Sequence, residues 1–257
     1  SPPLGNVILW LKYNKIYINL LPSPPLGAWQ IDMNYYNNGM TVRSIVFSEG
    51  EFYHLYSRGV DKRLIFIDDF DRKRFVRLLF LCNGSRPVVY REVKNLLLKD
   101  IDMGQKLVAI GAYCLMPNHF HLLIKETTEG GIVKFMSKLL TAYSTYFNKR
   151  YERAGHLFSG EFKSSHLDRD EYLKYIFSYI HLNPIKLIQN DWKERGILNK
   201  NQAEKYLNDY KYSSYLDYTD FNRDEGLILN KEFFPNYFEN IRDMEKEVKS
   251  WLSFQSE

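Results

Sequence analysis

Hydrophobic and polar positions alternate with a period of two in some segments of the chain, which is typical of strands. Residues 52–56 (FYHLY) and 119–124 (HFHLLI) show this alternation, and residues 107–115 are almost continuously apolar. Pro117 and Asn118 separate the last two segments, so they predict a hairpin turn. Residues 158–167 predict a further short hairpin or extended arm.

Other segments repeat their apolar residues at helical spacing. This pattern predicts helices over residues 69–82 and from Gly131 to about residue 151. A third helix is predicted from Asp168, which has capping-box spacing to Glu171, to about residue 183, because a proline follows there. The order β-α-β-β-α-α predicts an α+β fold with one antiparallel sheet and helices packed on one side of it.

The amino-terminal residues differ from the rest of the chain. The sequence SPPLG at residues 1–5 recurs at residues 23–27, and paired prolines exclude a helix or a central strand. We therefore expect Met40 to be the natural start and the preceding residues to be an extension or an over-called reading frame. The predicted divisions are an N-terminal extension over 1–45, a central domain over 46–190 and a C-terminal helical and loop extension over 191–257.

Composition narrows the class of protein only slightly. The 257 residues include 45% hydrophobic positions, enough for a full core, and no apolar run reaches the length of about 18 residues that a membrane span requires. The two cysteines, Cys82 and Cys114, have apolar neighbours, which favours buried thiols in a reducing cytoplasm. A net charge of +4 is compatible with nucleic-acid binding, and 20 tyrosines could offer stacking surfaces for unpaired bases.

Two histidines stand two residues apart on a predicted strand. Because side chains alternate along a strand, His119 and His121 are expected to point from one face and Phe120 from the other. Two neighbouring imidazoles can supply part of the ligand set of a divalent ion. The spacing alone also fits two histidines without any metal.

The helix that follows Asp168 carries three tyrosines along one flank of its apolar stripe. Tyr172, Tyr175 and Tyr179 share this flank, and Asn183 continues it one turn after Tyr179. A phenol and an amide at this spacing can address one site. Considered alone, the helix favours an amphipathic element whose tyrosines lie at the boundary of the core with their hydroxyls in water.

The two motifs together resemble a known family. Cys114–Ile124 (CLMPNHFHLLI), followed by Tyr179–Ile185 (YIHLNPI), resembles the HUH single-tyrosine transposases, in particular the REP-associated tyrosine transposases. The resemblance covers about residues 40–218. Further segments match that family in the same order: Phe52–Gly59, Ile67–Asp69, Tyr146–Arg150, Gly155–Phe158 and Tyr212–Tyr215.

The resemblance implies the HUH endonuclease fold, a ferredoxin-like antiparallel sheet with helices packed on one face. It implies that His119, His121 and Asn183 bind a divalent metal, Mg²⁺ or Mn²⁺, and that Tyr179 forms a covalent 5′-phosphotyrosyl intermediate. The implied substrate is single-stranded DNA with a hairpin or palindromic element, cleaved and rejoined during transposition, with no membrane partner. Completion of the active site within one chain or across a homodimer stays open.

Four cations are predicted to contact DNA: Arg58, Lys149, Arg150 and Lys163. The sequence departs from the family pattern next to the last of these. The family usually has an arginine before the aromatic-lysine pair, whereas this chain has Glu161 there. A carboxylate repels a DNA phosphate, so this arm either contacts DNA differently or impairs the activity of this copy.

Three other functions fit parts of the sequence. A replication initiator or relaxase uses the same HUH chemistry. A domesticated DNA- or RNA-binding protein could keep the fold and lose cleavage. A metal hydrolase would make the tyrosine incidental, but no further ligand motif of Asp, Glu or His supports it. A covalent protein–DNA adduct would separate the enzymes from the binding protein.

Overall fold

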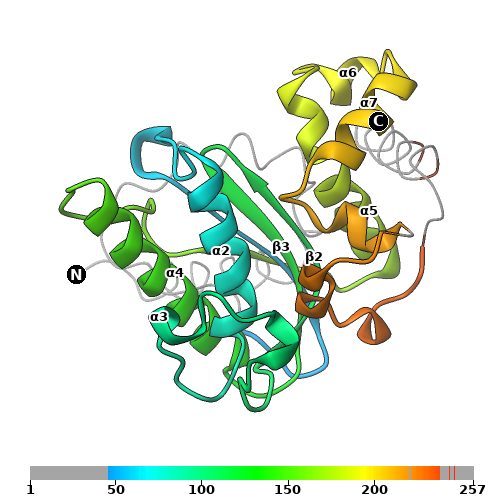
Figure 1. The fold of residues 1–257 in the computed structure, drawn as a ribbon. Helices are drawn as coiled ribbons and strands as arrows, with labels where there is room; N and C mark the ends of the chain where they lie inside the picture. The colour runs from blue at the N-terminus through cyan, green and yellow to red at the C-terminus, as the bar shows by residue number, and fades with distance from the viewer. Residues whose placement is uncertain (1–45, 220, 238–242, 244–245, 247–257) are drawn as a thin grey trace, which may run out of the picture. The chain divides into compact units, whose positions relative to one another are not determined.

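The computed structural model describes residues 46–219, 221–237, 243 and 246. Its four strands form one antiparallel sheet in the order β2-β3-β1-β4 (Figure 1). The predicted α+β architecture is confirmed, and the histidine strand β3 lies in the interior of the sheet. The strands are β1 (Phe52–Arg58), β2 (Val108–Met116), β3 (His119–Glu126) and β4 (Lys163–His166).

The three long helices occur along the chain in the order that the apolar periodicity predicts. The α-helices are α2 (Asp69–Cys82), α3 (Tyr90–Val93), α4 (Gly131–Arg150), α5 (Asp170–Leu182), α6 (Trp192–Arg195) and α7 (Lys200–Asp209). The 3-10 helices are η3 (Val60–Lys62), η4 (Leu98–Asp100), η5 (Asn183–Leu187), η6 (Ser214–Tyr218), η7 (Asp224–Ile228) and η8 (Lys231–Phe233). Within the described residues, no helix is long and apolar enough to cross a membrane.

A side-chain cap stabilises the start of α2, whereas α5 begins without one. Asp68 caps α2 by accepting from the Asp71 amide at 3.1 Å, and the Asp71 carboxylate accepts from the Ile67 amide at 2.9 Å. These reciprocal bonds satisfy amides that the first helical turn leaves free. The predicted cap of α5 at Asp168 is wrong, because Arg169 occupies the N-cap position without a side-chain cap bond. The Asp168 carboxylate lies 3.8 Å from the Arg169 guanidinium instead.

Helices α2 and α4 pack on the face of the sheet from which Phe120 points. The Phe75 ring of α2 lies 4.8 Å from the Phe120 ring and 4.9 Å from the Tyr143 ring of α4, centroid to centroid. All three residues are fully buried. A close approach at the start of α4 requires glycine, because a Cβ at Gly131 would lie 2.2 Å from the Leu107 carbonyl oxygen.

Helix α5 lies against β2 and β3 on the opposite face, so helices cover both faces of the sheet (Figure 1). The sequence predicted helices on one face, which holds for α2 and α4. The buried residues of α5 include Leu173, Ile176 and Ile180, which form the apolar stripe that the helical spacing predicted. An apolar stripe must pack against another apolar surface. The stripe of α5 therefore packs on the histidine face of the sheet, next to the polar side chains of that face.

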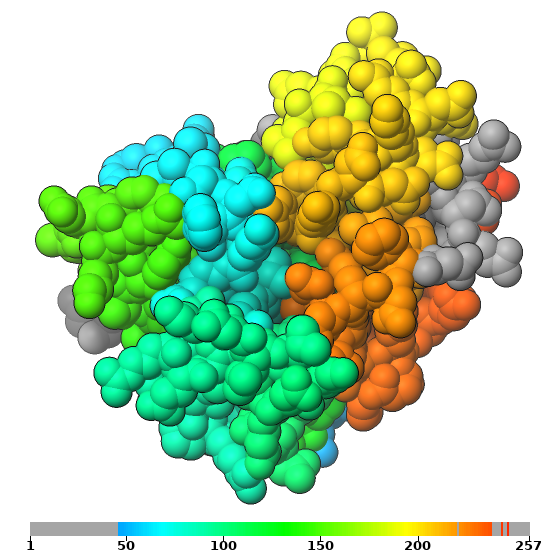
Figure 2. All heavy atoms as spheres, viewed as in Figure 1, coloured from blue at the N-terminus to red at the C-terminus, as the bar shows by residue number. Residues whose placement is uncertain are grey.

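The segment after α7 covers the outer edge of β2. Ser213 forms a β-bridge with Cys114, and the Leu115 amide donates to the Tyr212 carbonyl at 2.9 Å. Further along, the Asn230 amide donates to the Ile110 carbonyl at 2.9 Å. Figure 2 shows this orange segment meeting the residues around η4, where the Leu98 amide donates to Asp224. Covering the edge removes a surface on which another strand could pair.

The described residues belong to one unit by their contacts. Within residues 191–219 and 221–237, the chain packs with the sheet that precedes it. The predicted extension over residues 1–45 lies outside the described residues.

Candidate active site

The two histidines of β3 point away from the core, as their alternation predicted. Antiparallel pairing places Arg58 opposite His119, and Tyr56 opposite His121, so these four side chains share one face of the sheet. Phe120, between the histidines, is fully buried on the other face. His121 is 6% exposed and His119 is half-buried, so the histidine face is partly closed.

Helix α5 brings Tyr179 to this histidine face. The Tyr179 ring lies 5.4 Å from the His121 ring and 6.4 Å from the His54 ring, each in an edge-to-face arrangement. Tyr175, one turn earlier, is buried and stacks on Tyr179 at 6.0 Å. Tyr179 keeps partial exposure, so its phenol can meet a ligand beside the histidines.

Asn183 completes the flank that the helical spacing predicted. Its side chain acts on the Tyr179 hydroxyl and lowers the pKa of the phenol, so it favours the phenolate. The side chain is 3% exposed, and its Oδ1 atom has no hydrogen-bond partner. A buried acceptor without a donor is costly unless another group fills it, so Oδ1 is available to a ligand of positive charge.

The tautomer of His119 follows from Asn118. The Asn118 amide donates to the Lys62 carbonyl at 3.1 Å, which turns its Oδ1 toward His119 Nδ1 at 2.6 Å. Because Oδ1 can only accept, Nδ1 carries the proton and Nε2 keeps its lone pair. His119 therefore presents a free ligand atom, and Asn118 holds the ring orientation.

His121 is held in the same way by a third histidine. Its Nδ1 lies 2.9 Å from His54 Nε2, and its own Nε2 is buried without a partner. When His121 Nδ1–H donates to His54, Nε2 of His121 keeps a lone pair rather than an unsatisfied N–H. His54 thus orients the imidazole of His121.

Burial and nearby cations keep these imidazoles neutral. Burial first, and then Lys193, lowers the pKa of His54 to about 3. Burial, with Arg58 next, lowers the pKa of His119 to about 3, and the pKa of His121 falls well below its ordinary range for the same kind of reasons. Neutral imidazoles are the form that coordinates a metal.

The Tyr179 phenol is subject to opposing influences. Burial raises its pKa, whereas the Asn183 hydrogen bond and the charges of Lys186 and Arg58 lower it. The phenol is therefore protonated at neutral pH, and the groups that stabilise its anion already surround it.

The donor set fits a divalent cation. The free atoms are Nε2 of His119, Nε2 of His121 and Oδ1 of Asn183, two borderline nitrogens and one hard oxygen. Among the described residues, no group of three His, Cys, Asp or Glu side chains is arranged to hold a metal. The triad of His119, His121 and Asn183 is of another kind, because its third ligand atom is an amide oxygen.

The predicted DNA-contacting cations divide between the two faces of the sheet. Arg58 lies opposite His119 and Lys163 lies opposite Tyr56, both on the histidine face. Lys149 and Arg150 belong to α4, on the Phe120 face. Glu161 is exposed, just before β4.

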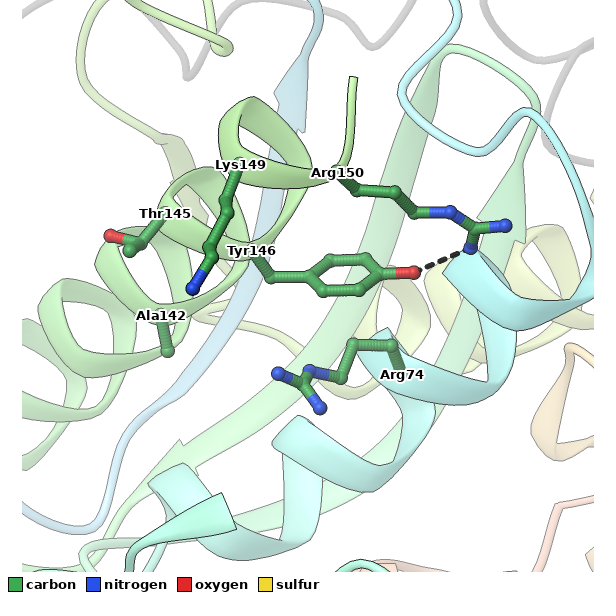
Figure 3. Close-up of a pocket in the computed structure, with 6 residues that line it drawn as sticks. All are labelled: Arg74, Ala142, Thr145, Tyr146, Lys149 and Arg150. Carbon is green, nitrogen blue, oxygen red and sulfur yellow. Dashed lines mark hydrogen bonds between the residues drawn. The ribbon is translucent and has the colours of Figure 1, made fainter. Parts of the chain in front are cut away.

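Lys149 and Arg150 line a shallow groove together with Arg74, Ala142, Thr145 and Tyr146 (Figure 3). Arg150 is committed to neighbours there: it donates to Asp68 at 2.6 Å, to buried Asp71 at 3.1 Å and to the Tyr146 hydroxyl at 2.7 Å. Its charge is therefore largely neutralised, whereas Lys149 is exposed. Contacts of all four cations with DNA stay predictions.

Sequence reasoning missed three residues of the site. The sequence pattern indicates no role in the site for His54, yet it contacts both His121 and Tyr179. Its place two residues before Tyr56 on an alternating strand was the available signal. Asn118 looked like a turn residue only. Lys193, whose ammonium lies over the Tyr179 ring, had no signal in its local sequence.

The buried histidines predict an acid-labile fold. The pKa values of His54 and His181 are lowered to about 3, so the unfolded chain binds protons that the folded chain refuses. Stability is therefore complete above pH 6.5 and falls as the pH drops toward 3, by about 1.4 kcal/mol per pH unit for each histidine. Together they remove about 5 kcal/mol by about pH 4.5.

Thermal unfolding followed by circular dichroism between about pH 7.5 and 4.5 measures this effect. His181→Gln removes one of the two histidines, so stability should fall less steeply with decreasing pH. His166→Gln, which replaces an exposed histidine, should leave this pH dependence unchanged. A melting temperature that does not fall across this range contradicts the lowered pKa values.

Comparison with known proteins gives a family and a similar structure. Residues 75–183 match the family model described as IS200-like transposase. No curated protein sequence matches the chain significantly. Among solved structures, the chain is similar to a REP-associated tyrosine transposase bound to a REP hairpin. The two are 11% identical with a TM-score of 0.41, over 72% of this chain and 90% of that one.

Proposed function

We propose that this chain, whose residues 75–183 match the IS200-like transposases, cuts and rejoins single-stranded DNA. The proposed reaction passes through a covalent 5′-phosphotyrosyl intermediate on Tyr179. The observation that carries this proposal is the meeting of one phenol with buried, unpartnered ligand atoms. Tyr179 lies between His121 and Asn183, and His121 Nε2 and Asn183 Oδ1 both lack hydrogen-bond partners. Fold stability alone does not favour such atoms.

The proposed chemistry is a balanced exchange of two phosphodiester bonds. The Tyr179 oxygen attacks phosphorus, the bond from phosphorus to the 3′ oxygen breaks, and the 5′ side of the DNA stays joined to the tyrosine. The phenol releases one proton to solvent and the leaving 3′ oxygen takes one up. The reverse attack by a 3′ hydroxyl, from the same or another DNA end, restores the phosphodiester without ATP.

The chain's own residues prepare the phenol for this attack. Asn183 and the charges of Lys186 and Arg58 lower the pKa of Tyr179 and so favour its anion. Asn118 and His54 fix the rings of His119 and His121. The latter two, with Asn183 Oδ1, would hold Mg²⁺ or Mn²⁺, which when bound stabilises negative charge on the phosphate.

The placement of the cations on the two faces of the sheet supports different DNA contacts for each face. Arg58 and Lys163 share the face of Tyr179, so we assign them to the strand that is cut. Lys149, on the other side, would contact a hairpin stem or a flanking strand. Tyr179 meets the histidines of its own chain, which supports an active site completed within one chain and not across a homodimer.

The test is the formation of a covalent adduct. The protein, incubated with single-stranded DNA carrying hairpins from the flanks of its gene, should give a slower band on a denaturing gel in Mn²⁺ or Mg²⁺. Chelation with EDTA should suppress the band, because the histidine face then loses its cation. DNA that is bound but never joined would support the domesticated binding protein instead.

A further inference from the structure

A lysine from beyond the family-matched segment contacts the proposed nucleophile. Lys193 belongs to α6, and its Nζ atom lies 4.0 Å from the centre of the Tyr179 ring. Its charge also acts on His54, His119 and His121, where it contributes to the lowered pKa of each. The ammonium therefore lies within the candidate active site, on the side of Tyr179 that faces α6.

The chain holds α6 in place from both sides. Trp192, the neighbour of Lys193, is 2% exposed and anchors the short helix. Gln189 donates to the Gly196 carbonyl at 2.7 Å and accepts from the Leu198 amide at 3.0 Å, which closes the loop around α6. The lysine thus extends from a fixed backbone toward Tyr179.

The Lys193 ammonium has no anion of its own. Within the part of the chain that the structure describes, it forms no ion pair and no hydrogen bond, and its contact is the aromatic face of Tyr179. Burial lowers the pKa of Lys193 to about 8, so the group still carries its charge at neutral pH. A cation–π contact offsets only part of the free energy that is lost when an ammonium is removed from water.

The other charges nearby do not supply the missing anion. Arg58 and Lys186 also act on Tyr179, and both are cations. Glu194 raises the pKa of Lys193, but it is exposed and forms no ion pair with it among the described residues. Three positive side chains around one phenol favour an anionic ligand at that place.

We propose that Lys193 is a catalytic residue that binds a non-bridging oxygen of the scissile phosphodiester while Tyr179 attacks it. This inference rests on the proposed function. As the Tyr179 oxygen approaches phosphorus, the ammonium moves from the ring face to the phosphate, which its flexible four-carbon stem permits. It neutralises charge that repels the phenolate and that grows on the phosphoryl oxygens before the 3′ oxygen leaves with a proton.

The experiment compares Lys193→Met with Lys193→Arg, and uses Lys205→Met, an exposed lysine on α7, as the matched control. Lys193→Met keeps the stem and removes the charge, so the rate of adduct formation should fall about 100-fold. Lys193→Arg should retain most of the rate. A DNA whose scissile phosphate is an uncharged methylphosphonate should react with the wild type and with Lys193→Met at similar rates.

Binding provides a readout that needs no cleavage. The affinity for single-stranded DNA is measured at several salt concentrations in a Tyr179→Phe background. Lys193→Met should make the plot of log affinity against log salt less steep by about 0.7, which corresponds to the loss of one phosphate contact. If the wild type forms no adduct but this slope falls, the proposed function fails and the phosphate contact of Lys193 stands. An unchanged slope, or an equal loss of rate on phosphodiester and methylphosphonate, overturns the proposal.

Discussion

Tyr179→Phe is expected to abolish the covalent adduct, with a loss of more than about 10⁴-fold in its rate of formation. The substitution removes one oxygen. Tyr179 lies 5.4 Å from the His121 ring and Tyr56 lies 5.9 Å from it, but Tyr179 is the phenol whose pKa Asn183 lowers. The fold should survive, because Tyr179 is only half-buried and the loss of one hydroxyl interaction costs about 1 kcal/mol. Labelled single-stranded DNA on a denaturing gel measures the adduct, and thermal unfolding measures stability.

The neighbouring tyrosines are matched controls for this result. Tyr175 is buried and stacks on Tyr179, whereas the Tyr172 hydroxyl accepts from Arg169 at 3.2 Å. Tyr172→Phe and Tyr175→Phe should both keep the adduct. If Tyr179→Phe still forms it while either control loses it, the nucleophile is wrongly assigned. If all three variants keep it, the nucleophile lies elsewhere in the chain.

The elements around the site were predictable because each is encoded locally. The alternation around His119 gave the direction of the histidines, and the spacing from Tyr179 to Asn183 gave a phenol and an amide on one helical flank. Both predictions concern side chains within one element. The structure confirms that these groups point as predicted and brings the two elements together.

The supporting residues of the site could not be predicted in the same way. His54 reaches His121 only because β1 pairs with β3 in one particular register. Lys193 reaches Tyr179 only because the chain turns back after α5, fixed by Trp192 and Gln189. Such contacts depend on tertiary packing, which local periodicity does not encode.

The same limit explains two differences in the fold. Apolar spacing indicates that α5 buries Ile176 and Ile180, but not which face of the sheet it covers. The spacing from Asp168 to Glu171 fits a capping box, but the Asp168 carboxylate lies beside the Arg169 guanidinium. Asp168 therefore does not cap α5. Arg150 likewise has the charge of a DNA contact and is occupied by Asp68 and Asp71.

Replacing both histidines of β3 is expected to remove metal binding and cleavage together. His119→Ala with His121→Ala deletes two of the three free ligand atoms, so the rate of adduct formation should fall more than about 10³-fold. Mn²⁺ binding, followed by titration calorimetry, should disappear in the double variant. His166→Ala, which removes an exposed histidine paired with Glu51, should change neither measurement.

Folding must be separated from ligand loss, because His121 is buried and bonded to His54. Alanine there leaves a small cavity and an unpartnered His54 nitrogen, at a cost of about 1–3 kcal/mol. Glutamine at both positions fills more of the space and provides a second test with the same expected loss of metal binding. Binding of hairpin DNA should persist in both double variants, since Arg58, Lys163 and Lys149 remain. Undiminished cleavage by either double variant in Mg²⁺ would exclude the histidine pair as metal ligands and leave Tyr179 to act with its surrounding cations alone.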